Sequence, residues 1–216
     1  MSAVAILYRE RFFRFFRPER LEGFTGWQGL WLLGLTTLPM LAAGATFGEW
    51  VKFHLFNPAT VALGLGIGGI AILVVERLPF PIRRRGLDSI KWQDALAVGL
   101  FQCLALWPGV SRSAAAILGG LMIGLERKAA VEYSFLAAVP VMFAAAIFEL
   151  AKSWSLLQPV DLLIFGVGFM MAFFSALAAV RFLLRFLQSR TLTLLGWYRL
   201  ALALLVWSLW GRGETL

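Results

Sequence analysis

The residues best suited to chemistry lie in the segment WPGVSRSAAA, residues 107–116, within an otherwise apolar stretch. Arg112 is the only lysine or arginine between Lys91 and Arg127, and a serine stands on each side of it. Ser111 is a good N-terminal cap and the alanines that follow are strong helix formers, so the pattern predicts that a helix begins here. The first turn of such a helix presents free backbone N–H groups and the positive end of the helix dipole.

Every group in this cluster donates hydrogen bonds, and the guanidinium of Arg112 adds a rigid fork of donors. A cluster of this kind suits an anionic group with several oxygens, phosphate above all. We therefore predict a phosphate site formed by Gly109, Ser111, Arg112 and Ser113. The alternative is that Arg112 pairs with a buried carboxylate and Ser111 only caps the helix.

Arg199, in GWYRLA, is a second arginine in apolar sequence. Two interpretations stay open for it. It can face the same phosphate as a second cation, or its long side chain can extend along apolar surface toward the membrane boundary.

The composition identifies the fold class. The chain has 216 residues, of which 60% are hydrophobic and 15% charged, far more apolar than a soluble domain. We predict an all-α polytopic membrane protein that forms a single membrane domain, residues 1–216. The expected elements are a remnant helix at 1–17, spans at about 27–47, 59–76, 129–151, 160–186 and 191–211, and a re-entrant helical hairpin at about 92–125.

The net charge of +8 does not indicate a nucleic-acid partner, because the basic residues cluster at the ends of the predicted helices. If residues 9–20 are cytoplasmic, alternation places Lys52 and Lys152 outside, and residues 77–91 and 181–190 inside. The inside loops then carry most of the lysines and arginines, as the positive-inside rule expects. The N-terminal apolar run, residues 3–7, is too short for a signal peptide.

The hairpin follows from the same alternation. Lys91 and Arg127 belong to one face only if the segment between them leaves that face and returns to it. Its two arms, residues 95–107 and 113–125, are each about 13 residues long, enough for half of a bilayer at about 1.5 Å per residue. Proline and glycine at 108–109 break the helix between the arms. Non-helical backbone at this depth must line protein or a cavity.

Two single residues exclude other chemistry. Cys103 is the only cysteine, so there is no internal disulfide, and we expect it to be a small buried residue. His54 is the only histidine, and we place it in a loop. No usual zinc spacing can be built from them, and we predict no metal ligand in this chain. Gly64, Gly66, Gly68 and Gly69 are expected to allow close helix contact.

The sequence resembles the undecaprenyl pyrophosphate phosphatases, the bacitracin-resistance family of bacterial inner-membrane enzymes. Residues 101–140, FQCLALWPGVSRSAAAILGGLMIGLERKAAVEYSFLAAVP, resemble the family's Pro-Gly-x-Ser-Arg-Ser signature and its flanks. FNPATVALGLGIGG and the YR of the last predicted helix are supporting matches. The resemblance implies a fold of two inverted halves, each with a re-entrant hairpin. It also implies that Arg112 and Ser111 are catalytic, and that the phosphate is held by Gly109, Ser111, Arg112, Ser113 and, as an option, Arg199.

The sequence departs from the family in two places. The family's earlier signature, a glutamate-rich stretch followed by Pro-Val-Ser-Ser-Thr-Gly-His, has no counterpart here, so we expect the N-terminal hairpin to be missing. The family implies a divalent cation, magnesium or calcium, whose ligands belong to that hairpin and not to this chain. The smaller departure is Ala116, where the family usually has threonine.

Two functions from different classes remain. The first is hydrolysis of undecaprenyl pyrophosphate to the monophosphate, which recycles the lipid carrier for cell-wall synthesis and confers bacitracin resistance. The second is a catalytically dead homologue that binds or translocates polyprenyl phosphates, and an anion transporter is a weaker third reading. The expected partners are a polyprenyl pyrophosphate and the lipid bilayer of the inner membrane, with no nucleic acid, and the oligomeric state stays open with a homodimer as one option.

Overall fold

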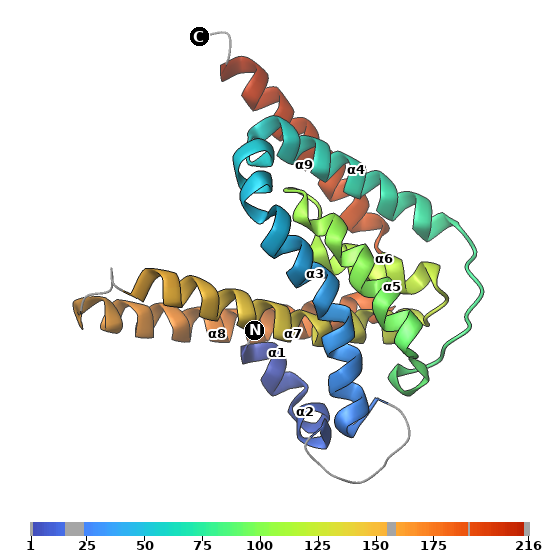
Figure 1. The fold of residues 1–216 in the computed structure, drawn as a ribbon. Coiled ribbons are helices and arrows are strands. Elements are labelled where there is room, and N and C mark those ends of the chain that lie inside the picture. The colour runs from blue at the N-terminus through green and yellow to red at the C-terminus, as the bar shows by residue number, and fades with distance from the viewer. Residues whose placement is uncertain (1, 16–23, 155–158, 190, 214–216) are drawn as a thin grey trace.

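Helices make up nearly all of the part of the chain that the structure describes (Figure 1). The structure is a computed structural model, and it describes residues 2–15, 24–154, 159–189 and 191–213. The long helices are α3 (Gly26–Leu55), α4 (Pro58–Arg77), α7 (Arg127–Ser153), α8 (Pro159–Ser189) and α9 (Thr193–Gly213). The shorter helices are α1 (Ser2–Leu7), α2 (Arg9–Phe15), η1 (Leu87–Ser89), α5 (Trp92–Cys103), η2 (Leu104–Leu106) and α6 (Arg112–Met122).

The five long helices are apolar and long enough to cross a membrane, so the predicted all-α polytopic fold class is confirmed. Four of the five predicted spans fall within one of them, and the fifth, 191–211, begins two residues before α9. Most of these helices run a few residues further than the predicted spans. Between α3 and α4, the side chain of Asn57 accepts a hydrogen bond from the Thr60 N–H at 3.0 Å, and Pro58 occupies the first position of α4.

The predicted helix at 1–17 is divided in two by a turn at Tyr8, and residues 16–17 lie outside the described part of the chain. The two parts pack differently: α1 contacts α7 and α8, whereas α2 contacts α3.

The hairpin of α5 and α6 begins and ends at the same end of the molecule, as the charge pattern predicted. The backbone N–H of Arg83 donates to the Gly124 carbonyl at 2.8 Å, and the N–H of Glu126 donates to the Arg84 carbonyl at 2.9 Å. These bonds join the segment before α5 to the segment after α6. Asp94 strengthens the join, because its carboxylate accepts from the backbone N–H of Lys91 at 2.9 Å and from Arg84 Nε at 3.1 Å.

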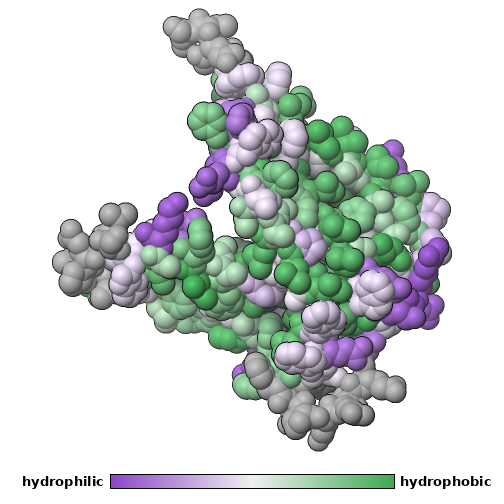
Figure 2. Space-filling view, viewed as in Figure 1, coloured by the Kyte–Doolittle hydropathy of each residue, from purple (hydrophilic) through white to green (hydrophobic). Residues whose placement is uncertain are grey.

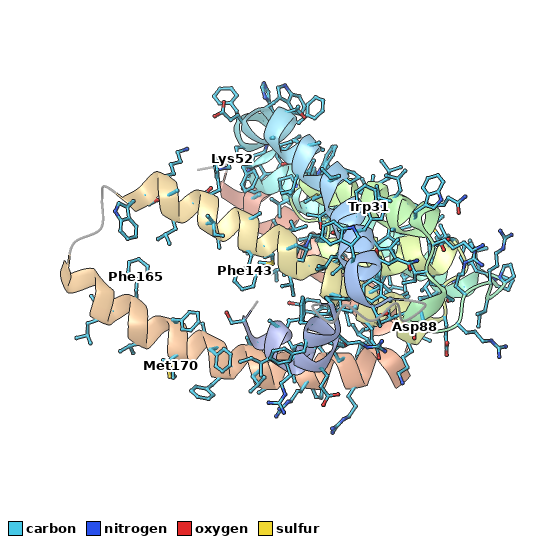
Figure 3. All side chains as sticks on the ribbon, turned by 60° about the horizontal axis from the view of Figure 1, so that its bottom comes forward. Trp31, Lys52, Asp88, Phe143, Phe165 and Met170 are labelled. Carbon is cyan, nitrogen blue, oxygen red and sulfur yellow. The ribbon has the colours of Figure 1, made fainter. Side chains whose placement is uncertain are left out.

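Ion pairs separate the helix ends into two groups. At the end where the hairpin begins, the guanidinium of Arg127 donates two hydrogen bonds to Glu76, at 2.8 and 2.6 Å. Lys52 lies 3.8 Å from Glu149 at the other end of the molecule. Figure 3 shows Lys52 and Asp88 near opposite ends of α3. The grouping agrees with the alternation inferred from the basic residues.

A buried polar contact fixes the first arm of the hairpin. The hydroxyl oxygen of Thr36 on α3 lies 2.9 Å from the Ala95 carbonyl oxygen of α5 and 2.5 Å from the hydroxyl of Tyr133 on α7. Tyr133 is 1% exposed. A Cβ at Gly99 would lie 2.6 Å from the Thr36 carbonyl oxygen, so only a glycine lets α5 approach α3 this closely.

The outer surface is apolar, as a bilayer requires. Figure 2 shows hydrophobic residues over most of one face, with hydrophilic residues at its margins. α7 and α8 project from one side of the molecule, and Phe143, Phe165 and Met170 on them are all exposed (Figures 1 and 3). The most apolar 18-residue window of α8 lies within Leu163–Leu187, and none of the residues in that window is buried. Acyl chains are the natural solvent for such a surface.

We predict that Glu76→Ala destabilises the protein by about 3 kcal/mol. The side chain of Glu76 is 3% exposed, and its carboxylate also accepts from the Leu192 N–H, just before α9, at 2.9 Å. Its loss leaves both Arg127 and a backbone N–H without their partner, which is costly when the groups are shielded from water. Thermal unfolding in detergent measures the effect.

The matched control for this change is Glu49→Ala, because Glu49 is exposed on α3 and forms no ion pair with the described residues. Equal melting temperatures for the two variants would contradict the bridging role of Glu76.

Candidate functional site

The turn between η2 and α6 breaks the helix in the way that proline and glycine require. Trp107 is extended, with ψ at 121°, as is usual for a residue before proline. Gly109 has a φ of +91°, which favours glycine over any residue with a side chain. The Val110 N–H donates back to the Trp107 carbonyl at 3.1 Å and closes the turn.

The turn lies directly against α4. A Cβ on Gly64 would overlap the carbonyl oxygen of Pro108, and a Cβ on Gly109 would overlap the carbonyl oxygen of Val61. The indole N–H of Trp107 donates to the Thr60 carbonyl at 3.0 Å. Two glycines and one side-chain hydrogen bond therefore hold the irregular backbone of the turn in contact with α4. Non-helical backbone is tolerated inside a membrane where protein surrounds it in this way.

The predicted cap at the start of α6 is confirmed. Ser111 is extended and its hydroxyl accepts from the Ala114 N–H at 3.3 Å. The hydroxyls of Ser111 and Ser113 lie 3.1 Å apart. Arg112 is the first residue of α6, so its own N–H and that of Ser113 belong to the first turn and have no acceptor within the helix.

Arg112 is half-buried, and its side chain forms no hydrogen bond or ion pair with any residue that the structure describes. The alternative in which it pairs with a buried carboxylate therefore has no partner within residues 2–15, 24–154, 159–189 and 191–213. An arginine without a counter-ion in apolar surroundings is electrostatically unfavourable unless an anion joins it.

Arg199 reaches the same turn from α9. It is 9% exposed, and its Nη2 donates to the carbonyl oxygen of Gly109. Its Nε is buried without an acceptor in the described structure. Of the two interpretations left open for Arg199, extension to the membrane boundary is wrong, because the guanidinium is directed inward at the hairpin.

A cavity of about 250 Å³ lies between α4, α5, α6 and α9, beside the turn. Its lining is apolar except for Ser111, Arg199 and the indole of Trp107. Ser111 belongs to the same face of α6 as Ala115 and Leu118, which also line the cavity. Gly109, Arg112 and Ser113 are not on its lining, so the structure brings Ser111 and Arg199 into the cavity and leaves Arg112 beside it.

Two expectations about single residues are wrong. His54 lies in the last turn of α3 and not in a loop, and its ring stacks on Trp50. Cys103 is half-buried rather than buried, with its thiol 3.5 Å from the Gly99 carbonyl oxygen. Helix α3 continues to Leu55, and only Phe56 and Asn57 separate it from α4.

No group of three histidine, cysteine, aspartate or glutamate side chains in the described structure could hold a metal ion. The lining of the cavity likewise includes no carboxylate and no histidine. The described residues thus provide donors for an anion but no ligand set for a cation.

The two contacts that fix the turn could not be predicted from the sequence. The bond from Arg199 to Gly109 joins residues 90 positions apart, and the bond from Trp107 to Thr60 joins residues 47 apart. The glycines of α4 were expected to serve packing, and they do. What the sequence did not show is that Gly64 accommodates the turn and that Gly68 accommodates the Arg199 guanidinium.

The fold and the site define a class: a polytopic helical membrane protein with a broken, re-entrant hairpin whose apex carries anion donors. Residues 1–205 match the family model described as bacitracin resistance protein BacA, and the chain belongs to this family.

Three curated relatives illustrate the similarity. The chain is 47% identical over 205 residues to an undecaprenyl-diphosphatase of Nitratidesulfovibrio vulgaris, covering 95% of this chain and 77% of the relative. It is 47% identical over 208 residues to an undecaprenyl-diphosphatase of Maridesulfovibrio salexigens, covering 96% and 79%. It is 46% identical over 180 residues to an undecaprenyl-diphosphatase 2 of Rhodospirillum rubrum, covering 83% and 66%.

We predict that Gly109→Ala destabilises the protein by at least about 3 kcal/mol, because the new methyl group is strained by the positive φ and also overlaps α4. Gly86→Ala is the matched control. Gly86 also has a positive φ, +73°, but a Cβ there would contact nothing within 4 Å.

The control should cost only the backbone strain of an alanine at φ +73° and ψ 167°, about 1–3 kcal/mol, because no overlap with another helix is added. Denaturant unfolding of both variants in detergent compares the two costs. A Gly109→Ala variant that loses no more stability than Gly86→Ala would show that the turn is not pressed against α4.

Proposed function

We propose that this chain hydrolyses undecaprenyl diphosphate to undecaprenyl phosphate and phosphate, and that the residues at the start of α6 bind the phosphate groups. Membership in the BacA family and the name shared by its curated relatives support the activity. Such a reaction recycles the lipid carrier of cell-wall synthesis, which supports the bacterial inner membrane as the location that we propose for the protein. A homodimer stays one option for the oligomeric state.

The observation that carries the proposal is the juxtaposition of the α6 N-terminus with an apolar cavity. Ser111 belongs to both, since it caps α6 and lines the cavity. A polyprenyl diphosphate has an anionic head joined directly to an apolar chain. The unpaired guanidinium of Arg112 and the free N–H groups of the first turn suit the head, and the apolar lining suits the first part of the chain.

The reaction transfers a phosphoryl group to water. The water oxygen forms a bond to the terminal phosphorus, and the bond from that phosphorus to the bridging oxygen breaks. Undecaprenyl phosphate then leaves with the bridging oxygen. Negative charge is spread over the oxygens of the transferred group in the transition state. Arg112 and the N–H groups of residues 112–113 would stabilise that charge, and Ser111 would orient one oxygen through its hydroxyl.

A divalent cation would neutralise charge on the two phosphates during such a reaction. The described residues do not fit one, because they include no group of three carboxylate, histidine or cysteine side chains close together. We therefore assign no step of the reaction to a metal held by these residues. The group that activates the attacking water is likewise not among the residues that line the cavity.

That last observation favours a second function, in which the chain binds or translocates polyprenyl phosphates without hydrolysing them. The two functions differ in one measurement. A binder retains the lipid diphosphate and releases no phosphate, whereas an enzyme releases phosphate at ordinary protein concentrations.

We predict that Arg112→Ala lowers kcat for phosphate release from farnesyl diphosphate by about 100-fold, the usual cost of removing a donor to a transition-state anion. Arg112→Lys should recover only part of the rate, because an ammonium keeps the charge but not the fork of donors. Phosphate release by the protein in detergent is the measurement.

Arg85→Ala is the matched control, because Arg85 is exposed near the hairpin entrance and forms no ion pair with the described residues. It should leave the rate unchanged. Wild-type turnover in the Arg112→Ala variant would overturn the assignment of Arg112, and binding without phosphate release by the wild-type chain would favour the second function.

A further inference from the structure

Arg199 and Arg112 are both arginines in apolar sequence, yet they lie in different surroundings. Arg112 is half-buried and has no partner among the described residues, whereas Arg199 is 9% exposed and uses its Nη2 to bind the Gly109 carbonyl. Gly109 is the residue of positive φ at which the turn changes direction, two residues before the Ser111 cap. The Arg199 guanidinium is therefore bonded to the backbone that sets the direction of α6.

α4 makes room for this guanidinium at one glycine. A Cβ on Gly68 would lie 2.7 Å from Nη2 of Arg199 and 3.4 Å from Nε, too close for an unchanged side chain. A Cβ on Gly66, two residues earlier, would meet nothing closer than the Ala203 Cβ at 3.9 Å. Gly68 therefore leaves space for the Arg199 guanidinium, whereas Gly66 on the same helix does not, and substitution of each glycine can test this difference.

The backbone from which Arg199 extends is itself held close to α4. A Cβ on Gly69 would lie 3.0 Å from the Gly196 carbonyl oxygen, and a Cβ on Gly196 would lie 3.2 Å from the Gly69 carbonyl oxygen. Gly196 precedes Arg199 by less than one helical turn. Because the two helices touch backbone to backbone here, the Arg199 side chain begins from a fixed point.

The geometry points to Arg199 as a positioning residue: its hydrogen bond to the Gly109 carbonyl holds the turn so that Ser111 faces the cavity and the first turn of α6 keeps its place beside it. The inference rests on the proposed function, since it assigns Arg199 a task in the same site. A neutral carbonyl leaves the charge of Arg199 uncompensated, so the residue also contributes positive potential to the cavity wall. Its effect on the reaction nevertheless passes through the backbone of the turn.

The first experiment measures the turn without any substrate. Amide hydrogen exchange over residues 107–116 reports how often the turn opens. Arg199→Met removes the bond to Gly109, and Gly68→Ala displaces the guanidinium while keeping it. Each should speed exchange in this segment by about tenfold, as expected for the loss of a hydrogen bond from a charged group. Gly66→Ala, the matched control, should leave exchange unchanged.

The second experiment measures farnesyl diphosphate hydrolysis per folded protein. Arg199→Met and Gly68→Ala should each lower kcat by about tenfold or more and change KM much less, because the donors that act in the transition state are misplaced. The double variant should be no worse than the worse single variant, since both remove the same contact. Arg199→Lys, which can still donate to a carbonyl, should recover part of the rate and part of the slow exchange.

The outcomes separate this inference from the proposed function. Faster exchange in Arg199→Met and Gly68→Ala supports the positioning role even if the wild-type protein hydrolyses nothing, a result that would overturn only the hydrolase. Unchanged exchange in both variants together with a lower kcat would overturn the positioning role and would show that Arg199 touches the substrate. A lower melting temperature with unchanged kcat per folded protein would also overturn it, because Arg199 would then serve stability alone.

Discussion

Backbone that leaves the helical conformation inside a membrane must find its hydrogen bonds and its contacts in protein, and the turn at residues 107–111 is where this chain meets that requirement. The carbonyl of Gly109 accepts from Arg199, the carbonyl of Trp107 accepts from the Val110 N–H, and the Trp107 indole donates to Thr60. Gly64 on α4 brings the helix close enough to cover the rest. Without these contacts the turn at the apex of the hairpin would have no fixed position, and the first turn of α6 would have no fixed direction.

At the opposite end of the hairpin, polar contacts again hold neighbouring helices together. Charged groups gather there and join helices to one another: Glu76 binds both Arg127 and the backbone before α9, and Asp94 binds Arg84. These contacts hold α4, α7 and α9 and the entrance to α5 in one register. The apex is thus positioned from both sides, by salt bridges at the end where the hairpin begins and by glycine contacts at the turn itself. A rigid apex suits a site that must present donors before its ligand arrives.

Much of this arrangement could be predicted from the sequence, because its signals are local. Runs of apolar residues predict the spans, the charge alternation between Lys91 and Arg127 predicts the hairpin, and a serine before three helix formers predicts the cap at Ser111. The remainder depends on contacts between distant segments. Nothing near Arg199 in the sequence shows that it reaches Gly109, and the family resemblance placed it only as an optional phosphate ligand.

The central claim is that Arg112 lies against a diphosphate held at the start of α6. Solid-state NMR can test it with the protein labelled with ¹⁵N-arginine and bound to a farnesyl methylenediphosphonate, whose ³¹P nuclei report nearby guanidinium nitrogens. The account predicts a ³¹P–¹⁵N distance of about 4 Å, as expected for a charge-assisted hydrogen bond through one phosphate oxygen, and loss of this coupling in Arg112→Ala. A coupling that persists unchanged in Arg112→Ala, or that is absent from the wild-type complex, would contradict it.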